Sequence, residues 1–354
     1  MANKLKKAAY IDHSFKKKTQ SNNFLREILS KEYELTELWD DTWKGGNKVS
    51  IEYLNREKFH TIFFFQILPP LSCLKKLNCK NIVWFPMYDQ EEIRDFPFYI
   101  PYLGLNMKIF SFSKKLYGEL KKAGLNCSYY KYHLKPVVPI LPCSEAKRVF
   151  FWMRTSDITW DIVKKLLGKN NIEKIIMKAT PDYNYKLVLP SKEDIDRYNI
   201  QIVNGWLNKK EYDKLLSSCN IFIAPRQAEG IGMSFIEALS RRMCVIASDN
   251  STMNEYIVHE RNGLLYDLKN PRELDLSNLA EMCENAGKTA EENCNLWERM
   301  EHRILIDLTR LNKKCRLMKL LYFQLIYVFL MIWKKLKRNR VKLIKKVLKC
   351  IERE

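Results

Sequence analysis

Short apolar runs alternate with amphipathic segments along most of the chain of 354 residues. In the first half, four apolar runs predict buried strands: Ala8–Ile11, Thr61–Leu68, Asn81–Phe85 and Met107–Phe112. Two segments with apolar positions three and four residues apart, Asn23–Leu29 and Lys114–Ala123, predict helices. Gly124 stands just past the second helix, where a left-handed end is expected. Strands that alternate with helices favour a parallel sheet with helices on both faces.

The alternation stops over residues 135–147, which hold three prolines, and then restarts. Further strands are expected at Arg148–Met153, Glu173–Lys178, Ile200–Asn204, Ile221–Ala224 and Cys244–Ala247, with helices at Thr159–Leu167, Lys209–Ser217 and Ser234–Arg241. We therefore expect an α/β protein with a first domain over residues 1–140, a second over 141–310 and a tail over 311–354. Ligands of such sheets bind at the carboxyl ends of the strands, in the cleft between the domains.

Composition and charge narrow the function. Hydrophobic residues make up 46% of the chain, which excludes a disordered protein. The net charge is +20, but residues 311–354 alone hold ten Lys, four Arg and two Glu. Because the positive charge is concentrated in a tail with apolar neighbours, we expect no nucleic-acid partner. The ten cysteines are scattered without a CxxC pair, and no long apolar segment opens the chain. Both features favour reduced thiols and a cytoplasmic location.

The tail suggests a membrane surface. Leu317–Trp333 is 17 residues long and is interrupted by Lys319 and Gln324, so it falls short of a bilayer span. Interfacial insertion is the favoured interpretation, with a span or an ordinary packed helix as alternatives. The segment Val341–Ile351 has one apolar and one basic helical face, which suits an anionic leaflet but also a solvated helix. We expect a peripheral protein on the inner face of the cell membrane.

The most informative segment runs from the strand at 221–224 through a loop with Gly230 and Gly232 into a helix for which Ser234 is the expected N-cap. Such a turn offers free backbone N–H groups to a phosphate. Glu229 and Glu237 can face the same cleft, where sugar hydroxyls would suit carboxylate acceptors. Judged from these residue types alone, Glu229 could equally be a solvated loop residue and Glu237 a residue on the helix surface.

Glu229 and Glu237, with seven residues between them, resemble the signature of retaining glycosyltransferases of family GT4. Five flanking segments extend the resemblance: Gly205-Trp206-Leu207, Asn220–Pro225, Glu255–Ile257, Asn262–Leu265 and Trp297-Glu298. It is strong over 148–310 and weaker over 1–135. It implies the GT-B fold, two Rossmann-like domains facing across a cleft. It also implies a nucleotide-diphosphate-sugar donor, no metal or other cofactor, and a glycan or lipid acceptor, as in bacterial lipopolysaccharide or capsule synthesis. The tail, and not the resemblance, is the reason to expect that this acceptor is membrane-associated.

The resemblance also implies roles for single residues. Glu237 would bind the ribose, Glu229 the donor sugar, and Arg154 the leaving diphosphate. The remaining donor-binding residues would be Gly205, Trp206, Pro225, Gly230, Ile231, Gly232, Met233 and Ser234. On the acceptor side we expect Asp89 to act, with Tyr88 and His13 as alternatives.

The chain departs from the family pattern in three places. Thr159 stands where the family has a lysine; Lys178 could replace it, although we expect Lys178 to be an ordinary surface residue. Arg242 stands where a glycine is usual, which puts the local loop geometry in doubt. The stretch 84–90 has no histidine. A catalytically inactive, nucleotide-sugar-binding scaffold is therefore the alternative function.

A metal site is not expected. Asp194-Ile-Asp196 has the form of a metal-binding D-x-D motif. It follows Ser191-Lys-Glu, however, so the pattern is typical of the polar first turn of a helix with Ser191 as its cap.

Overall fold

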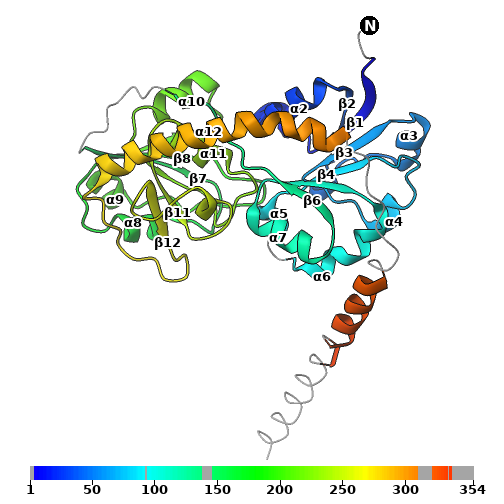
Figure 1. The fold of residues 1–354 in the computed structure, drawn as a ribbon. Coiled ribbons are helices and arrows are strands. Elements are labelled where there is room, and N and C mark those ends of the chain that lie inside the picture. Colours follow the sequence, from blue (N-terminus) through cyan, green and yellow to red (C-terminus); the bar gives the residue numbers. More distant parts are fainter. Residues whose placement is uncertain (1–3, 92–93, 138–145, 310–320, 334, 337–354) are drawn as a thin grey trace, which may run out of the picture.

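The computed structural model describes residues 4–91, 94–137, 146–309, 321–333 and 335–336 (Figure 1). They form two six-stranded parallel sheets, ordered β2-β1-β3-β4-β5-β6 and β12-β11-β10-β7-β8-β9. The first comprises β1 (Lys6–Asp12), β2 (Tyr33–Trp39), β3 (Thr61–Phe65), β4 (Ile82–Phe85), β5 (Lys108–Ser111) and β6 (Asn126–Tyr129). The second comprises β7 (Lys147–Met153), β8 (Ile172–Ala179), β9 (Ile200–Asn204), β10 (Ile221–Ile223), β11 (Cys244–Ser248) and β12 (Gly263–Tyr266).

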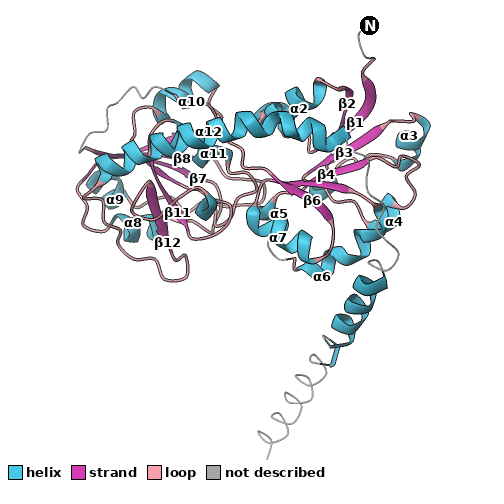
Figure 2. Ribbon diagram, in the orientation of Figure 1, coloured by secondary structure: helices cyan, strands magenta, loops and turns pink. Residues whose placement is uncertain are grey.

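Helices cover the sheets of both domains (Figure 2). Those of the first domain are α1 (Lys16–Thr19), α2 (Asn23–Ser30), α3 (Ile51–Arg56), α4 (Leu71–Leu74), α5 (Tyr88–Glu91), α6 (Phe96–Tyr99) and α7 (Lys114–Lys122). Those that follow are α8 (Trp160–Leu167), α9 (Lys192–Arg197), α10 (Lys209–Leu216), α11 (Met233–Ser240) and α12 (Leu279–Thr309). Short 3₁₀ turns lie at Thr42–Lys44, Ile100–Leu105 and Met253–Glu255.

The predicted α/β fold with two parallel sheets is confirmed, and each predicted strand lies within three residues of its expected bounds. The prediction missed β2, β6 and β12, which are edge strands of their sheets. An edge strand is less enclosed than a central one, so its sequence need not form a long apolar run. In β2, for example, Glu34 and Glu37 interrupt the apolar pattern.

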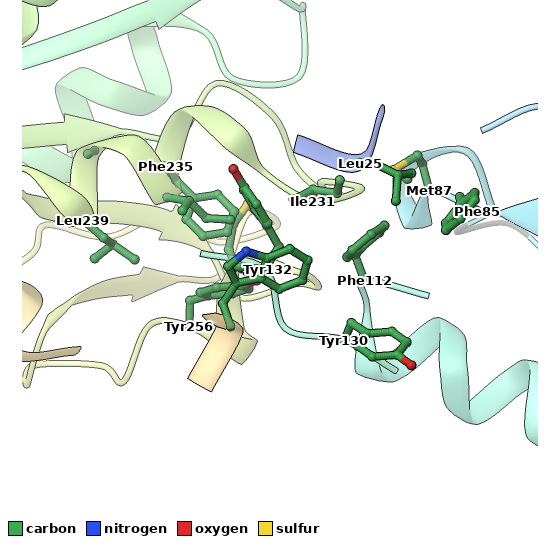
Figure 3. Close-up of a cluster of buried hydrophobic side chains, with 14 of the residues drawn as sticks. Leu25, Phe85, Met87, Phe112, Tyr130, Tyr132, Ile231, Phe235, Leu239 and Tyr256 are labelled. Carbon is green, nitrogen blue, oxygen red and sulfur yellow. Dashed lines mark hydrogen bonds between the residues drawn. The ribbon is translucent and has the colours of Figure 1, made fainter. Parts of the chain in front are cut away.

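One cluster of buried side chains continues from the first domain into the second (Figure 3). The first domain contributes, among others, Leu25, Phe85, Met87, Phe112, Tyr130 and Tyr132; the second contributes Ile231, Phe235, Leu239 and Tyr256. The Tyr256 hydroxyl also donates a hydrogen bond to the Tyr132 carbonyl oxygen at 2.7 Å. Apolar burial therefore stabilises the contact between the domains as well as each domain.

Helix α12 joins the domains a second time. It begins against the second domain and runs along the molecule to the first (Figure 1). The Trp297 ring packs edge-on against Tyr132, with centroids 4.9 Å apart. Near its end, the Leu308 carbonyl oxygen accepts a hydrogen bond from Lys108 Nζ at 2.6 Å. The last turns of α12 thus lie against the first sheet.

Helix 321–333 packs against the first domain through Phe323, Ile326 and Tyr327. Large apolar side chains on its other sides are exposed, among them Leu325 at 71% and Phe329 at 67%. No helix within the described residues is long and apolar enough to cross a bilayer. The predicted amphipathic segment Val341–Ile351 lies outside the described residues, as does the rest of 337–354.

Arg242 has a positive φ of 58°. It follows the end of α11, and the amide of Met243 donates to the Ala238 carbonyl oxygen at 3.0 Å, which closes the helix end. The arginine therefore adopts the left-handed conformation that a glycine would favour at this helix end.

Glu255 of the second domain binds the first turn of α7 in the first. Its carboxylate accepts hydrogen bonds from the Ser113 hydroxyl at 3.0 Å, the Lys114 amide at 2.7 Å and the Tyr129 hydroxyl at 3.1 Å. A carboxylate at a helix N-terminus is stabilised by free amides and by the helix dipole. Glu255 therefore fixes the position of one domain against the other.

We predict that Glu255→Ala lowers the free energy of unfolding by ~1–3 kcal/mol, because several donors lose a charged acceptor. Thermal melting followed by circular dichroism measures the change. Glu292→Ala, at an exposed position in the middle of α12, is the matched control. Equal melting temperatures for the two variants would contradict this account of the domain contact.

Candidate functional site

A cavity of about 680 Å³ lies between the two domains. Most of the residues predicted for the site line it: Asp89, Arg154, Trp206, Glu229, Gly230, Ile231, Gly232, Met233, Ser234 and Glu237. Gly205 and Pro225 are not among the lining residues; their carbonyl oxygens accept hydrogen bonds from the Thr180 and Thr155 hydroxyls. His13 and Tyr88, the alternatives to Asp89, do not line the cavity either.

Two glycines shape the loop between β10 and α11. Gly232 has a φ of +83°, and a Cβ there would lie 1.8 Å from the Phe235 ring. At Gly230, a Cβ would lie 2.8 Å from Met87 Cβ and 2.9 Å from Asp89 Oδ1, both in the first domain. The loop therefore needs glycine both for its backbone conformation and for close approach of the opposite wall.

The prediction that Ser234 caps α11 is wrong. The helix begins at Met233 with Gly232 as its N-cap, and no side chain caps its first turn. A glycine in the left-handed conformation starts the helix without supplying a side-chain acceptor. The helix start, with the positive end of its dipole, therefore meets the cavity along the lining residues 230–234.

A chain of alternating charges crosses the cleft. Arg154 Nε and Nη2 donate to Asp182 Oδ1 at 3.0 and 2.9 Å. Arg226 pairs with Asp182 Oδ2 and donates through Nη1 to Asp89 Oδ2 at 2.9 Å. Burial alone would raise the pKa of Asp182, but the guanidiniums of Arg154 and Arg226 outweigh burial and hold that pKa below its usual value. Asp89 belongs to the first domain, so this chain of ion pairs joins the two walls.

Arg226 and Asp182 are parts of this site that sequence reasoning missed. Arg226 follows Pro225 directly after β10, and Asp182 lies in the loop after β8. Charged residues at the carboxyl ends of two inner strands of the sheet are the signal that could have found them, because those ends face the cleft.

The prediction for Lys178 is wrong. We expected an ordinary surface residue, but Lys178 is 3% exposed and lines the cavity. It pairs in register with Trp152 of β7, and its Nζ lies 3.8 Å from the centroid of the Trp152 ring. Burial, with Arg154 nearby, lowers the pKa of its amine to about 8. Lys178 is on β8, which lies inside the sheet between β7 and β9, so its side chain is buried although it is charged.

Several buried polar atoms of the lining residues have no hydrogen-bond partner among the described residues. They are three oxygens, Gln66 Oε1, Asp89 Oδ1 and Glu229 Oε1, and two nitrogens, Lys178 Nζ and Arg226 Nε. Burial raises the pKa of both Asp89 and Glu229, although the charge of Arg226 opposes that rise. Each unpaired buried group costs ~1–3 kcal/mol, so such a concentration in one cavity is typical of a site that binds a polar ligand.

Glu237, a further lining residue, has its Oε1 atom bound by Lys209 Nζ and lying 3.5 Å from Arg241 Nη2. Both ion pairs use the same oxygen atom. Trp206 is 52% exposed, and Lys18 Nζ from the first domain lies 4.2 Å from the centroid of its ring. The cavity lining therefore includes a carboxylate and an exposed aromatic ring.

The prediction of Ser191 as a helix cap is confirmed, since its hydroxyl accepts from the Asp194 amide at 3.1 Å. Asp194 itself accepts hydrogen bonds from the Trp160 indole and from Lys164 Nζ. The carboxylate therefore has a structural role at the start of α9. Among the described residues, no group of three or more His, Cys, Asp or Glu side chains is placed to hold a metal ion.

Sequence comparison agrees with this geometry. Residues 190–292, from the start of α9 into α12, match the model of the family described as "Glycosyl transferases group 1". An uncharacterized glycosyltransferase of Methanocaldococcus jannaschii is 27% identical over 124 residues, 31% of this chain and 35% of that protein. The match thus spans about a third of the length of this relative.

Solved structures share the whole architecture. HepE of Anabaena, in complex with UDP and glucose, superposes with a TM-score of 0.60 at 13% identity, over 86% of this chain and 100% of that one. Sucrose-phosphate synthase of Thermosynechococcus elongatus gives 0.58 at 11% identity, over 85% and 98%. The GT-B fold is therefore confirmed, as is the resemblance to the group 1 glycosyltransferases.

We predict that the Arg226–Asp89 contact couples the walls energetically. Arg226→Met lowers stability by ~1–3 kcal/mol, because it leaves two carboxylates without their shared cation. Asp89→Asn removes one of those charges, so the double variant loses less than the two single variants together. A double-mutant cycle by denaturant unfolding measures the coupling, expected at ~0.5–3 kcal/mol. Additive effects would show that the contact does not join the walls.

Proposed function

We propose that the protein is a retaining glycosyltransferase of the GT4 type that uses a nucleotide-diphosphate sugar. The observation that carries the proposal is the set of unpaired groups in the cavity. Cations and helix amides on the second-domain wall suit a diphosphate, and the unpaired oxygens suit hydroxyl groups. A sugar linked to a diphosphate supplies both. The complex of HepE with UDP and glucose supports this choice of ligand class.

The diphosphate would lie between Arg154, Lys178 and the amides of residues 230–234. These groups are fixed before the reaction, and they face the position where negative charge grows as the sugar leaves. Two cations and a helix N-terminus can stabilise the departing diphosphate, so we propose that no metal is needed for this step. Thr159 had suggested an inactive scaffold, but Lys178 brings an amine into the same cavity, which favours the enzyme.

The nucleoside would bind against Trp206 and Glu237, both of which line the cavity. The Trp206 ring offers a face for the base. The second carboxylate oxygen of Glu237, which makes no ion pair within the described part of the chain, can accept hydrogen bonds from ribose hydroxyls. Glu229, whose Oε1 is unpaired, would accept from a hydroxyl of the donor sugar. Bound in this way, the sugar would point toward Asp89 and the first domain.

Transfer with retention would follow from this arrangement. The acceptor hydroxyl attacks the anomeric carbon from the side on which the diphosphate leaves. The bond to the phosphate oxygen breaks as the new bond to the acceptor oxygen forms, and the acceptor proton passes to the departing diphosphate. The walls joined by Arg226 and Asp89 would keep water away from the donor and so limit its hydrolysis.

We further propose that the acceptor is held at a membrane, as a glycan or lipid of a bacterial surface polysaccharide. The exposed apolar side chains of helix 321–333 lie on the first domain, the acceptor side. The basic residues that follow them in sequence suit the anionic cytoplasmic leaflet. The protein would thus work on the inner face of the cell membrane.

The donor site is tested by thermal shift with UDP, GDP, CDP and ADP. One nucleoside diphosphate should raise the melting temperature of the wild type, because it binds only the folded state. Lys178→Met should weaken binding of that diphosphate about tenfold, equivalent to ~1.4 kcal/mol, and leave binding of the nucleoside unchanged. Lys174→Met, on the same strand but outside the cavity, is the matched control.

The same titration has an expected pH dependence. The pKa of Lys178 is about 8, so its amine loses its charge as the pH rises through that value. Affinity of the wild type for the diphosphate should therefore fall above about pH 8, and the fall should be smaller in Lys178→Met. Identical pH profiles in wild type and variant would remove Lys178 from the diphosphate site.

Membrane association is tested by flotation with phosphatidylcholine vesicles, with and without phosphatidylglycerol. The wild type should float with the anionic vesicles, and added salt should weaken this binding. The double variant Leu325→Glu with Phe329→Glu should stay in the soluble fraction. Val188→Glu replaces an 80% exposed apolar residue of the second domain and should float like the wild type. Flotation of the double variant would show that helix 321–333 is not the membrane contact.

A further inference from the structure

Gln66 is a buried amide on the first-domain wall of the cavity. It follows the last residue of β3, is 8% exposed and lines the cleft. Its Oε1 atom has no hydrogen-bond partner among the described residues. Neither the motif search nor the family pattern pointed to this position.

The backbone holds Gln66 in an unusual conformation. Its φ is +67°, and the Ile67 amide donates to the Phe65 carbonyl oxygen at 2.7 Å. A hydrogen bond between residues i and i+2 around a positive φ is a strained form of the γ-turn, and a residue other than glycine adopts it at a cost. The Gln66 amide also donates to the Phe85 carbonyl oxygen at 2.8 Å, which ties the turn to β4. Such strain at a cavity points to a function for the side chain.

Two further unpaired oxygens line the same cavity. Asp89 Oδ1 follows the end of β4, the strand next to β3, and Glu229 Oε1 comes from the opposite wall. All three need hydrogen-bond donors. A hydroxyl-rich sugar supplies donors, whereas an ionised phosphate has only acceptors and would be repelled by ionised Asp89. Lys16 and Lys18 also line the cavity and would attract a phosphate, so the test includes a phosphate acceptor.

Resting on the proposed function, we propose that Gln66 binds a hydroxyl of the acceptor, and that the acceptor is a sugar hydroxyl of a glycan and not a lipid phosphate. Gln66 lies on the first-domain wall, opposite the groups assigned to the diphosphate. Its amide oxygen would hold one acceptor hydroxyl while another attacks. In that step a bond from the acceptor oxygen to the anomeric carbon forms. The bond from that carbon to the diphosphate oxygen breaks, and the acceptor proton leaves on the diphosphate.

The test compares two acceptor probes, octyl glycosides of common hexoses and dodecyl phosphate, with the donor selected by thermal shift. Gln66→Gly removes the amide and fits the positive φ, so it separates loss of the side chain from misfolding. Gln66→Asn keeps an amide and tolerates the left-handed region. Lys58→Gly, at an exposed position of the first domain with φ +50°, is the matched control.

We expect the wild type to transfer sugar to an octyl glycoside and not to dodecyl phosphate, as detected by mass spectrometry. Gln66→Gly should lose about 10- to 100-fold in transfer, with unchanged binding of the nucleoside diphosphate and unchanged donor hydrolysis. Gln66→Asn should recover part of the transfer, and Lys58→Gly all of it. Transfer to dodecyl phosphate, or full transfer by Gln66→Gly, would overturn the proposal. Absence of any donor binding by the wild type would instead refute the proposed function itself.

Discussion

The contact of Arg226 with Asp89 and Asp182 is the interaction on which the site depends. The Arg226 guanidinium forms ion pairs with one carboxylate from each wall, Asp89 and Asp182. Asp182 forms a further ion pair with Arg154. The cleft therefore has its width set by an ion-pair chain and by Gly230, where any larger residue would collide with Met87 and Asp89. Both features place the unpaired groups of the two walls within one cavity, close enough to serve a single pair of substrates.

Leaving several buried polar groups without partners costs free energy, and the rest of the fold must offset that cost. The apolar cluster that continues from one domain to the other does so, together with α12, which packs on both domains. Glu255 adds a third link by binding the first turn of α7. A rigid frame of this kind can hold donors and acceptors in place before a ligand arrives, which is how a site stabilises growing charge without rearranging. The strained turn at Gln66 is held in place in the same way, because its backbone is hydrogen-bonded to Phe85 at the end of β4 while its side chain lines the cavity.

The sequence predicted the fold well because central parallel strands are apolar over their whole length, as in Thr61–Phe65 and Ile221–Ile223. The loop was predictable because two glycines, Gly230 and Gly232, stand between an apolar strand and a helix, and the structure shows that larger residues would collide there. Arg226 and Asp182 were missed although both follow inner strands, because a charged residue after a strand can equally be solvated. Gln66 gave no signal in the sequence, because its backbone conformation and its place on the wall appear only in the folded cleft. Lys178 was misjudged for the same reason: a lysine looks solvated until the neighbouring Trp152 and the opposite wall are in place.

A crystal structure of the protein with the nucleoside diphosphate that stabilises it most would test the central claim directly. The account predicts that phosphate oxygens lie within hydrogen-bond distance of Lys178 Nζ and the Arg154 guanidinium, with the ribose at Glu237 and the base on Trp206. A nucleotide bound outside this cavity, or one whose phosphates lie against the first domain and leave Lys178 unpaired, would contradict it.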